Sequence, residues 1–464
     1  MNAKELMQMG VPMGEPVKQA ISFVADLALA GINKNAIRKE VAALVESPES
    51  FVDDGLRGAF AKALVDNVNV VRQEAVPYRQ WGKDLEPEAV QQMERACYLP
   101  VSVAGALMPD AHLGYGLPIG GVLGTDNAVI PYAVGVDIAC RMKMTVLDLP
   151  VKDFDHKTDR LKGAIERETR FGIGASFKKR REHDVLDQDW TVSPVTKRSK
   201  DKAWSQLGSS GSGNHFVEFG FFTANEKIGG LEPGEYIALL SHSGSRGTGA
   251  QVCNHYSKLA MEAHADLPKE LKHLAWLDLD EEAGAEYWAA MSLMGEYAAA
   301  NHACIHRHVS ENLGLEVLLD IENHHNFAWK EAHEVDGERR EVIVHRKGAT
   351  PAGKGMLGII PGSMATPGFV VRGKGNPVSL DSASHGAGRV MSRNKANKTF
   401  KWQDVNQVLK DRGVDLMSAG LDEVPGVYKD IHEVMDAQTD LVDVLGQFDP
   451  KIVKMAPHGE RPED

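Results

Sequence analysis

The chain has 464 residues, of which 43% are hydrophobic, 25% are charged and 6% are aromatic. That hydrophobic content, spread evenly along the sequence, excludes a largely disordered protein and is enough for a large buried core. The chain contains 52 lysines and arginines and 65 aspartates and glutamates, so its net charge is −13. A polyanion must therefore be bound by a local cationic site or by metal ions.

Residues 1–75 are predicted to form a helical N-terminal extension. The first residues lack the basic start and apolar core of a signal peptide. Apolar side chains recur at helical spacing in three stretches: Val17, Ile21, Phe23, Val24, Leu27 and Leu29; Ile37, Val41, Leu44 and Val45; Phe60, Leu64 and Val68. We expect about three helices here, with a role in packing or oligomerisation and no part in catalysis.

From residue 76 onward the pattern predicts an α+β fold, with short apolar runs between glycine-rich turns. The expected strands are Val101–Leu107, Ala128–Val134, Met144–Leu149, Tyr236–Leu240 and Val342–His345. The expected helices are Glu86–Tyr98, Val252–Ala265 and Asp280–Leu313. The charged segment Lys178–Lys202 is predicted to be an exposed loop or lid, either solvated or in contact with nucleic-acid phosphates, and residues 457–464 a flexible tail.

The cysteines favour a reducing compartment. Cys97, Cys140, Cys253 and Cys304 are widely spaced and form no CxxC pair, which argues against a disulfide scaffold or a zinc ribbon. No window reaches the roughly 18 uninterrupted apolar residues that would span a bilayer. We therefore expect a cytoplasmic protein with no membrane partner.

Residues of the kind that bind metals occur in glycine-, serine- and asparagine-rich contexts. Asp137 and Cys140 are three residues apart, so both side chains can point to one ion in a tight turn. Together with neutral imidazoles they suit a divalent transition metal, and the single thiolate could bridge two ions. The histidines in such contexts are His215, His242, His325 and His385, whereas His112, His324 and His345 are weaker candidates.

Two further loops can present backbone N–H groups to phosphate oxygens, namely Ser241–Gly249 and Pro361–Met364. Arg246, Arg389 and the pair Arg346–Lys347 can add charge. The sequence has no GxxxxGK[ST] motif, no GxGxxG motif after a strand and no KxDG-like lysine. If a nucleotide becomes covalently attached, histidine is therefore the best nucleophile.

Taken together, these residues resemble the RtcB family of RNA-splicing ligases, which use GTP to join a 2′,3′-cyclic phosphate or 3′-phosphate end to a 5′-hydroxyl end. The resemblance covers the chain from about Pro77 to Lys454. Eight stretches match in order: MPDAHLGYGLPIGG, VGVDIAC, GSGNHFVE, SHSGSRG, HHN, VHRKGAT, IPGSM and HGAGRVMSR.

The resemblance implies an RtcB-like α+β catalytic domain over residues 76–456, with β-sheets around a central metal and nucleotide cleft. It implies two Mn²⁺ ions bridged by Cys140, one completed by His242 and His325 and the other by Asp137 and His215. It makes His385 the nucleophile that takes GMP from GTP, and places Asp110 and Arg389 near the RNA end. The implied GTP or GMP contacts are Asn214, His215, Phe216, Val217, Glu218, His325, Asn326, Pro361, Gly362, Ser363, Met364, His385, Gly386, Ala387, Gly388 and Lys454.

The expected reaction passes GMP from His385 to the RNA 3′-phosphate, after which the 5′-hydroxyl expels GMP. The implied partners are RNA strands with a 2′,3′-cyclic phosphate or 3′-phosphate end and a 5′-hydroxyl end. The resemblance also allows an archease-like activator as a partner. Two alternatives stay open: a metal-dependent phosphoesterase or cyclic-phosphate hydrolase that never ligates, and a non-catalytic RNA-end-binding protein. The chain departs from the family pattern in its N-terminal helices, at Gly368 in place of a hydroxyl residue, in the segment Lys178–Lys202 and in residues after Lys454.

Overall fold

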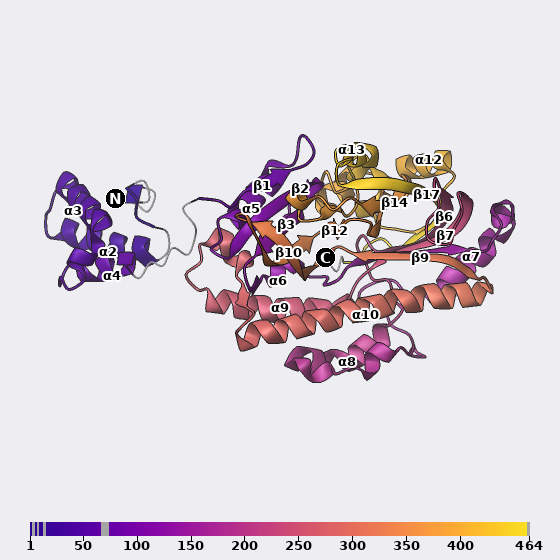
Figure 1. Ribbon diagram of the computed structural model, residues 1–464, viewed down its shortest axis with the longest axis horizontal. Helices are drawn as coiled ribbons and strands as arrows, with labels where there is room; N and C mark the ends of the chain where they lie inside the picture. The colour runs from indigo at the N-terminus through magenta and orange to yellow at the C-terminus, as the bar shows by residue number, and fades with distance from the viewer. Residues whose placement is uncertain (2–4, 7–8, 13–14, 66–73, 462–464) are drawn as a thin grey trace.

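The N-terminal helices form a unit with its own apolar core. The computed structural model describes residues 1, 5–6, 9–12, 15–65 and 74–461. The elements of the extension are α2 (Glu15–Leu29), α3 (Lys34–Glu46), the 3-10 helix η1 (Pro48–Phe51) and α4 (Gly58–Val65). Their shared buried cluster contains Phe23, Val41 and Phe60 and draws only on residues of this region. Figure 1 shows these helices set apart from the rest of the molecule.

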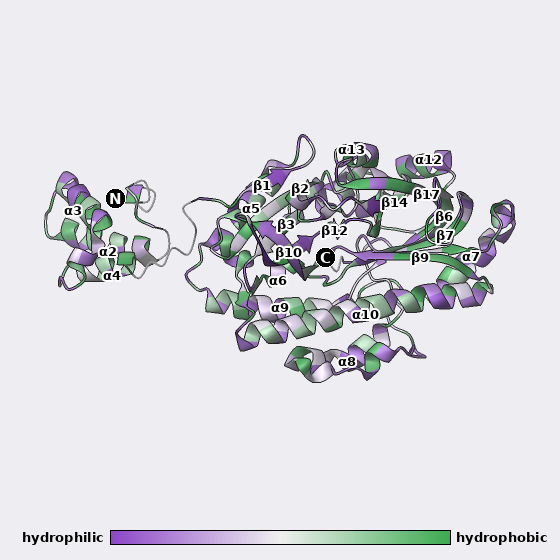
Figure 2. Cartoon of the chain, viewed as in Figure 1, coloured by the Kyte–Doolittle hydropathy of each residue, from purple (hydrophilic) through white to green (hydrophobic). Residues whose placement is uncertain are grey.

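The helical pattern of the extension is largely confirmed. Figure 2 shows hydrophobic and hydrophilic residues mixed along α2, α3 and α4, as expected of helices that bury one face each. Two of the apolar residues at helical spacing do not lie on the buried face of α2: Ile21 is 43% exposed and Leu29 is 87% exposed. Val68 lies outside the described residues. The proposed boundary between extension and catalytic domain at residue 75 stays a prediction.

The rest of the chain is built around two large sheets, which confirms the predicted α+β class. The first has five strands in the order β1 (Tyr78–Gln80), β2 (Ser102–His112), β3 (Ile119–Thr125), β11 (Glu338–Lys347) and β10 (Asn326–Val335). The second has eight: β13 (Leu357–Ile360), β14 (Gly368–Gly373), β17 (Val442–Met455), β6 (Phe216–Ala224), β7 (Gly234–Ser243), β5 (Arg141–Leu147) and β9 (Val317–His324), with β16 (Asp415–Ser418) paired to β17.

Two small sheets of two strands each complete the β-structure of the described residues. They pair β12 (Ala349–Pro351) with β15 (Ser382–Ser384), and β4 (Ala128–Val129) with β8 (Leu277–Asp278). The predicted strand Ala128–Val134 is wrong beyond residue 129, because Pro131 begins the short helix α6 (Pro131–Val134). Proline is favoured at a first helical position, where its missing N–H has no partner to lose.

Helices cover the eight-stranded sheet. The long α10 (Glu282–Leu313) runs along β5 and β7, with α9 (Arg246–Ala263) beside it and α8 (Pro194–Gln206) packed on α9 (Figure 1). The others are α5 (Pro87–Cys97), α7 (Phe154–Glu168), α11 (Arg393–Thr399), α12 (Trp402–Arg412), α13 (Ile431–Asp436) and the 3-10 helices η2 (Val151–Asp153), η3 (Asp184–Asp187), η4 (Trp190–Val192), η5 (Lys269–Leu274), η6 (Pro377–Ser379), η7 (Leu421–Glu423) and η8 (Pro425–Val427). The predicted helices thus correspond to α5, α9 and α10. No helix among the described ranges is long and apolar enough to cross a membrane.

The segment Lys178–Lys202 is not the loop that its charge pattern predicts. Residues 194–202 of the segment belong to α8, which has proline at its first helical position and is capped by the Ser193 hydroxyl, which accepts the Val195 N–H. Val195 and Ala203 are buried in the largest apolar cluster. A hydroxyl N-cap before proline is a helix-start signal that outweighs the polar composition.

The two sheets meet at His325. This residue is the only one between β9, at the edge of the eight-stranded sheet, and β10, at the edge of the five-stranded sheet. Its N–H donates to the Cys140 carbonyl, and its carbonyl accepts the Ala349 N–H. The residues that bear candidate chemistry gather around this junction.

Candidate active site

Four of the five candidate metal ligands stand next to, or within, strands of the eight-stranded sheet. Cys140 directly precedes β5, His215 directly precedes β6, His242 lies within β7, and His325 directly follows β9. Because β6, β7, β5 and β9 are neighbours, their paired backbones bring these side chains together. Asp137 joins them from the turn before Cys140, whose N–H donates to the Asp137 carbonyl.

The donor atoms form two groups of three that share the Cys140 sulfur. The first contains Cys140, His242 and His325, and the second contains Asp137, Cys140 and His215. The sulfur lies 3.0 Å from His242 Nε2 and 3.5 Å from His215 Nε2. His242 Nε2 is 3.2 Å from His325 Nε2, and His215 Nε2 is 3.1 Å from Asp137 Oδ2. All five residues are buried.

The protonation of these groups fits a metal ion. Burial lowers the pKa of His242 to about 3 and holds the pKa of His325 well below its usual value, so both rings are neutral at pH 7. His242 Nδ1 lies 3.1 Å from the Asn214 carbonyl, to which it can donate only as Nδ1–H. Its Nε2 then presents a lone pair toward the sulfur, which is the orientation of a metal-binding imidazole fixed by an outer hydrogen bond.

The backbone around Asp137 leaves no room for movement. The Ser245 N–H donates to Asp137 Oδ1 at 3.0 Å. A Cβ atom at Gly244 would lie 2.1 Å from the Asp137 carboxylate, so glycine is required at this contact. Ala139, between the two ligands, has a φ of 58°, a conformation that L-residues adopt rarely and that clusters at functional sites. These contacts fix the Asp137 carboxylate and the turn that joins it to Cys140.

His385 lies beside this cluster, directly after β15. Its ring centroid is 5.0 Å from that of His325, and its Nδ1 is 2.7 Å from Asp110 Oδ2. The same oxygen accepts the N–H groups of His385 and Gly386. Asp110 is therefore a hydrogen-bond partner of His385, and its side chain is fully buried. Its position near an RNA end stays a prediction.

Electrostatics keep the Asp110 carboxylate charged. Burial alone would raise its pKa, but His385, Lys429 and His112 outweigh burial and lower the pKa below its ordinary value. In its neutral form with the proton on Nδ1, His385 donates to the ionised Asp110 and its Nε2 carries the lone pair. His385 is thus prepared as a nucleophile through Nε2.

The turn after His385 fits closely over Asp110. Gly388 has a φ of +74°, and a Cβ atom there would lie 2.0 Å from the Asp110 carbonyl oxygen. Arg389 follows, with Nη1 3.1 Å from Glu423 Oε2 and Nη2 donating to the Asp422 carbonyl at 2.7 Å. Arg389 is the second residue assigned to the RNA end. Here its guanidinium is held by an acidic loop.

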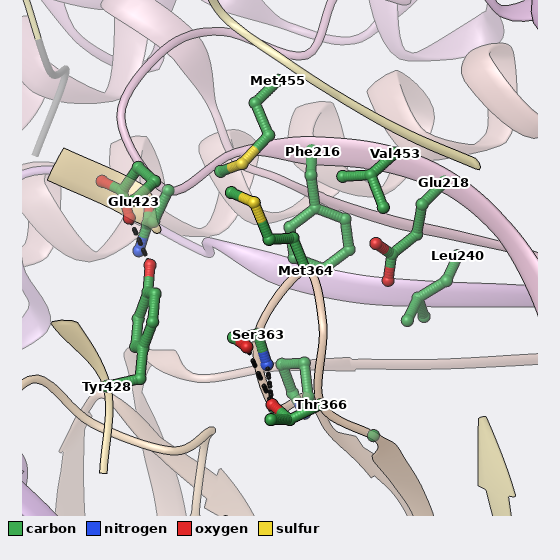
Figure 3. Close-up of a pocket in the computed structure, with 14 residues that line it drawn as sticks. Phe216, Glu218, Leu240, Ser363, Met364, Thr366, Glu423, Tyr428, Val453 and Met455 are labelled. Carbon is green, nitrogen blue, oxygen red and sulfur yellow. Dashed lines mark hydrogen bonds between the residues drawn. The ribbon is translucent and has the colours of Figure 1, made fainter. Parts of the chain in front are cut away.

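A pocket lined by both polar and apolar residues opens next to the cluster. Figure 3 shows Phe216 beside Met364 and Met455, Glu218 near Val453 and Leu240, and the Ser363–Thr366 turn and Tyr428 at the edges of the pocket. The ring of Phe216 is 5.7 Å from that of His242, which connects the pocket to the metal ligands. Burial raises the pKa of Glu218 well above its usual value.

Seven predicted nucleotide contacts line this pocket: Asn214, Phe216, Glu218, Pro361, Gly362, Ser363 and Met364. Val217 does not, because its side chain is buried in a separate apolar cluster, as alternation along β6 requires. Asn326 instead lies at the metal site, with Nδ2 donating to the Asp137 carbonyl and Oδ1 accepting the Gly348 N–H. Gly386, Ala387 and Gly388 belong to the turn above Asp110.

Lys454 lies at the far end of the same region. Its Nζ pairs with Glu166 and stands 5.6 Å from the ring centre of Phe171. Its neighbours on β17, Val453 and Met455, line the pocket. Lys454 pairs with Val217 across the two strands, and alternation along β17 turns its side chain to the face opposite to Val453 and Met455.

Sequence reasoning missed several residues of the pocket wall. Thr366 accepts the Ser363 N–H at 2.7 Å and shapes the turn, two residues before Gly368, where a hydroxyl was expected. Glu423 and Tyr428 also line the pocket and bond to each other. No motif marks them, because they come from the irregular region between β16 and β17.

Fold and site together define an enzyme of mixed α+β architecture with a buried cysteine, histidine and carboxylate centre that indicates metal binding. Comparison with known proteins gives the family. Residues 92–455 match the family model described as tRNA-splicing ligase RtcB. The RNA-splicing ligase RtcB of Escherichia coli strain K12 is 33% identical, covering 82% of this chain and 97% of that protein.

Archaeal relatives agree with this assignment. The tRNA-splicing ligase RtcB of Methanococcus maripaludis is 31% identical over 81% of this chain and 92% of its own length. That of Archaeoglobus fulgidus is also 31% identical, over 76% of this chain and 87% of its own length. The chain therefore belongs to the RtcB family of RNA ligases.

Proposed function

We propose that this chain is a GTP-dependent RNA ligase that joins 2′,3′-cyclic phosphate or 3′-phosphate ends to 5′-hydroxyl ends through a GMP-histidine at His385. One observation carries the proposal: two triads of buried donor atoms share the Cys140 sulfur, and the adjacent His385 is held through Nδ1 by Asp110, so that Nε2 is the ring nitrogen left for the reaction. Membership of the RtcB family supports the same reaction.

The metal in this proposal is Mn²⁺, in two positions. Cys140, His242 and His325 would hold one ion, and Asp137, Cys140 and His215 the other. A divalent ion that is intermediate between hard and soft suits this mixture of thiolate, imidazole and carboxylate ligands. When bound, the ions supply Lewis-acid stabilisation of negative charge on phosphate oxygens. The outer contacts from Asn214 to His242 and from Ser245 to Asp137 hold the ligands in orientation.

His385 would attack the α-phosphate of GTP through Nε2 and release pyrophosphate. The charged Asp110 stabilises the positive charge that the ring acquires, through the 2.7 Å contact at Nδ1. A 2′,3′-cyclic phosphate end is first hydrolysed: water attacks phosphorus, the P–O2′ bond breaks, and a 3′-phosphate and a 2′-hydroxyl remain. The GMP then passes to the RNA 3′-phosphate, which frees the imidazole. Attack by the 5′-hydroxyl on that activated phosphate forms the phosphodiester and releases GMP.

The pocket beside the cluster would bind the guanosine. Glu218 can accept hydrogen bonds from the N–H groups of a guanine edge, and Phe216 and the two methionines give the ring an apolar surface. The turn at Ser363 offers its backbone and hydroxyl, and Lys454 would serve the base after leaving Glu166. Arg389 remains our proposal for an RNA-end contact. An archease-like activator is a candidate partner.

Labelled nucleotide tests the function directly. The purified protein, incubated with Mn²⁺ and α-labelled GTP, should acquire acid-labile, alkali-stable label, and the His385→Ala variant should acquire none. A variant that still becomes labelled would refute His385 as nucleophile.

An RNA substrate with both ends separates the alternatives. A ligase produces joined RNA only when GTP is present. A hydrolase would release 3′-phosphate ends without joined product even with GTP. An RNA-end-binding protein without catalysis would retain the RNA unchanged and take up no label.

A further inference from the structure

The segment that follows β17 returns to the active site. Residues 456–461 lie beyond the part of the chain that matches the RtcB family model, which ends at residue 455. A turn closed by the Glu460 N–H and the Pro457 carbonyl, with Gly459 at a φ of 93°, redirects the chain.

Two contacts attach this segment to loops near the candidate site. The hydroxyl of Ser212 donates to the Arg461 carbonyl at 2.6 Å, and the Ile173 N–H points to Glu460 Oε2 at 3.4 Å. Ser212 is only 1% exposed, so this bond is largely shielded from water. That residues 457–464 form a flexible tail stays a prediction, and residues 462–464 lie outside the described part of the chain.

Ser212 belongs to the loop that carries two site residues. It lies in the glycine-rich loop 211–213, followed directly by Asn214, whose carbonyl orients His242, and by His215. The loop has few backbone anchors of its own: the Gly211 carbonyl accepts the Gly172 N–H at 2.7 Å, and Gly211 and Gly213 have positive φ values. Glycines leave such a loop with high conformational freedom unless other contacts restrict it.

The segment starts at the other end of the nucleotide pocket. Val453 and Met455 line the pocket, and Lys454 lies between them on β17. Residues 456–461 therefore connect the base end of the pocket with the loop at its metal end. Each end of the segment is anchored, because Ala456 and Met455 are buried and Arg461 bonds to Ser212.

We propose that residues 456–461 are a positioning strap for the GTP site. By holding loop 211–213 against the end of β17, the strap keeps Asn214 and the base-binding wall in their bound arrangement and so raises affinity for GTP. This inference rests on the proposed function, since it takes GTP as the ligand. The strap touches no reacting atom, and its effect is on binding.

A double-mutant cycle tests the strap, using deletion of residues 457–464, Ser212→Ala and the two changes combined. Each single change should raise the KM for GTP in guanylate formation by roughly fivefold, the effect of one net hydrogen bond, and leave kcat within about twofold. The combined variant should be no worse than the deletion alone, because both changes remove the same bond. Ser102→Ala is the matched control: its buried hydroxyl also donates to a carbonyl, that of Ala96, away from the site.

Hydrogen exchange gives a readout that does not depend on catalysis. The amides of residues 211–214 should exchange faster in the deletion variant and in Ser212→Ala than in the unaltered protein or in Ser102→Ala. Unchanged KM and unchanged exchange in the deletion variant would overturn the strap, as would a Ser212→Ala effect that persists in full after deletion. If the unaltered protein forms no guanylate, the proposed function fails, and exchange alone decides whether the strap holds the loop.

Discussion

Asp110 determines which nitrogen of His385 faces the site. Its Oδ2 accepts from the ring and from two backbone N–H groups, so the histidine is held by both its ring and its main chain. Lys429, which donates to the carbonyls of Pro109 and Ala111, keeps a positive charge close to this buried carboxylate. The arrangement combines orientation of the imidazole with stabilisation of its charged form.

Asp110→Asn should separate these two effects. The amide oxygen can still accept from His385, but the negative charge is lost, so we expect guanylate formation to slow by at least roughly a hundredfold. Single-turnover labelling with α-labelled GTP measures the rate, and thermal unfolding checks the fold. A variant with the rate of the unaltered protein would show that the carboxylate charge has no part in catalysis.

Cys140→Ser should remove metal from both positions, because one sulfur is shared by the two triads. A serine hydroxyl remains protonated at neutral pH and replaces a thiolate poorly. Metal content per chain after dialysis, measured by elemental analysis, should fall from two Mn²⁺ to below one. Cys253→Ser, at a buried thiol that contacts the Pro131 carbonyl, should keep both ions. Two ions retained in Cys140→Ser would contradict the bridging role.

Among the elements, the turn after β15 depends on a single glycine. Gly388→Ala must accept both a positive φ and a Cβ atom 2.0 Å from the Asp110 carbonyl, and we expect it to lose His385 labelling. Gly174→Ala is a matched control, since Gly174 has a φ of +71° and nothing within 4 Å of an added Cβ. The control should lose only about 1 kcal/mol of unfolding free energy, the ordinary cost of that backbone conformation. Urea unfolding measures the stability of both variants, and labelling with GTP measures their guanylate formation. Equal effects in Gly388→Ala and Gly174→Ala would contradict the role of the close contact at Gly388.

The sequence predicts elements well where one local signal dominates. The Asp280–Leu313 pattern corresponds to α10 because apolar side chains recur without proline, and Gly314 ends the helix in the left-handed conformation. Prediction from the sequence fails for α8, where the many charged residues obscure the capping signal. It also fails for the residues after Val129, where proline starts a helix. The metal-ligand candidates were predictable from motifs. The Asp110–His385 contact was not, because it joins residues 275 apart through tertiary packing.

At the scale of the whole molecule, buried neutral histidines make stability depend on pH. His345 is fully buried, with Nε2 accepting the Ile130 N–H and Nδ1 donating to the Leu123 carbonyl, and burial lowers its pKa to about 4. Burial likewise lowers the pKa of His112 to about 4 and that of His324 to about 3. An unfolded histidine binds a proton near pH 6.5. Their contribution to stability is therefore complete above about pH 6.5 and is lost as the pH falls toward 4.

Urea unfolding in EDTA at pH 7, 6 and 5 checks this dependence. The free energy of unfolding should fall as the pH falls, with each such histidine contributing at most about 1.4 kcal/mol per pH unit. His345→Gln, which keeps a donor and an acceptor but does not titrate, should have a shallower slope by about that amount. An unchanged slope would mean that His345 is not held neutral.

The place of β17 in the eight-stranded sheet bears on how a cell makes this protein. β17 is the last strand in the described chain, yet it lies between β14 and β6. A nascent polypeptide on the ribosome thus has two open strand edges, and exposed edges invite pairing with other chains. Sheet closure must wait until residues 442–455 emerge from the exit tunnel, so the edges of β14 and β6 stay open after both strands have been made and need protection from aggregation until then.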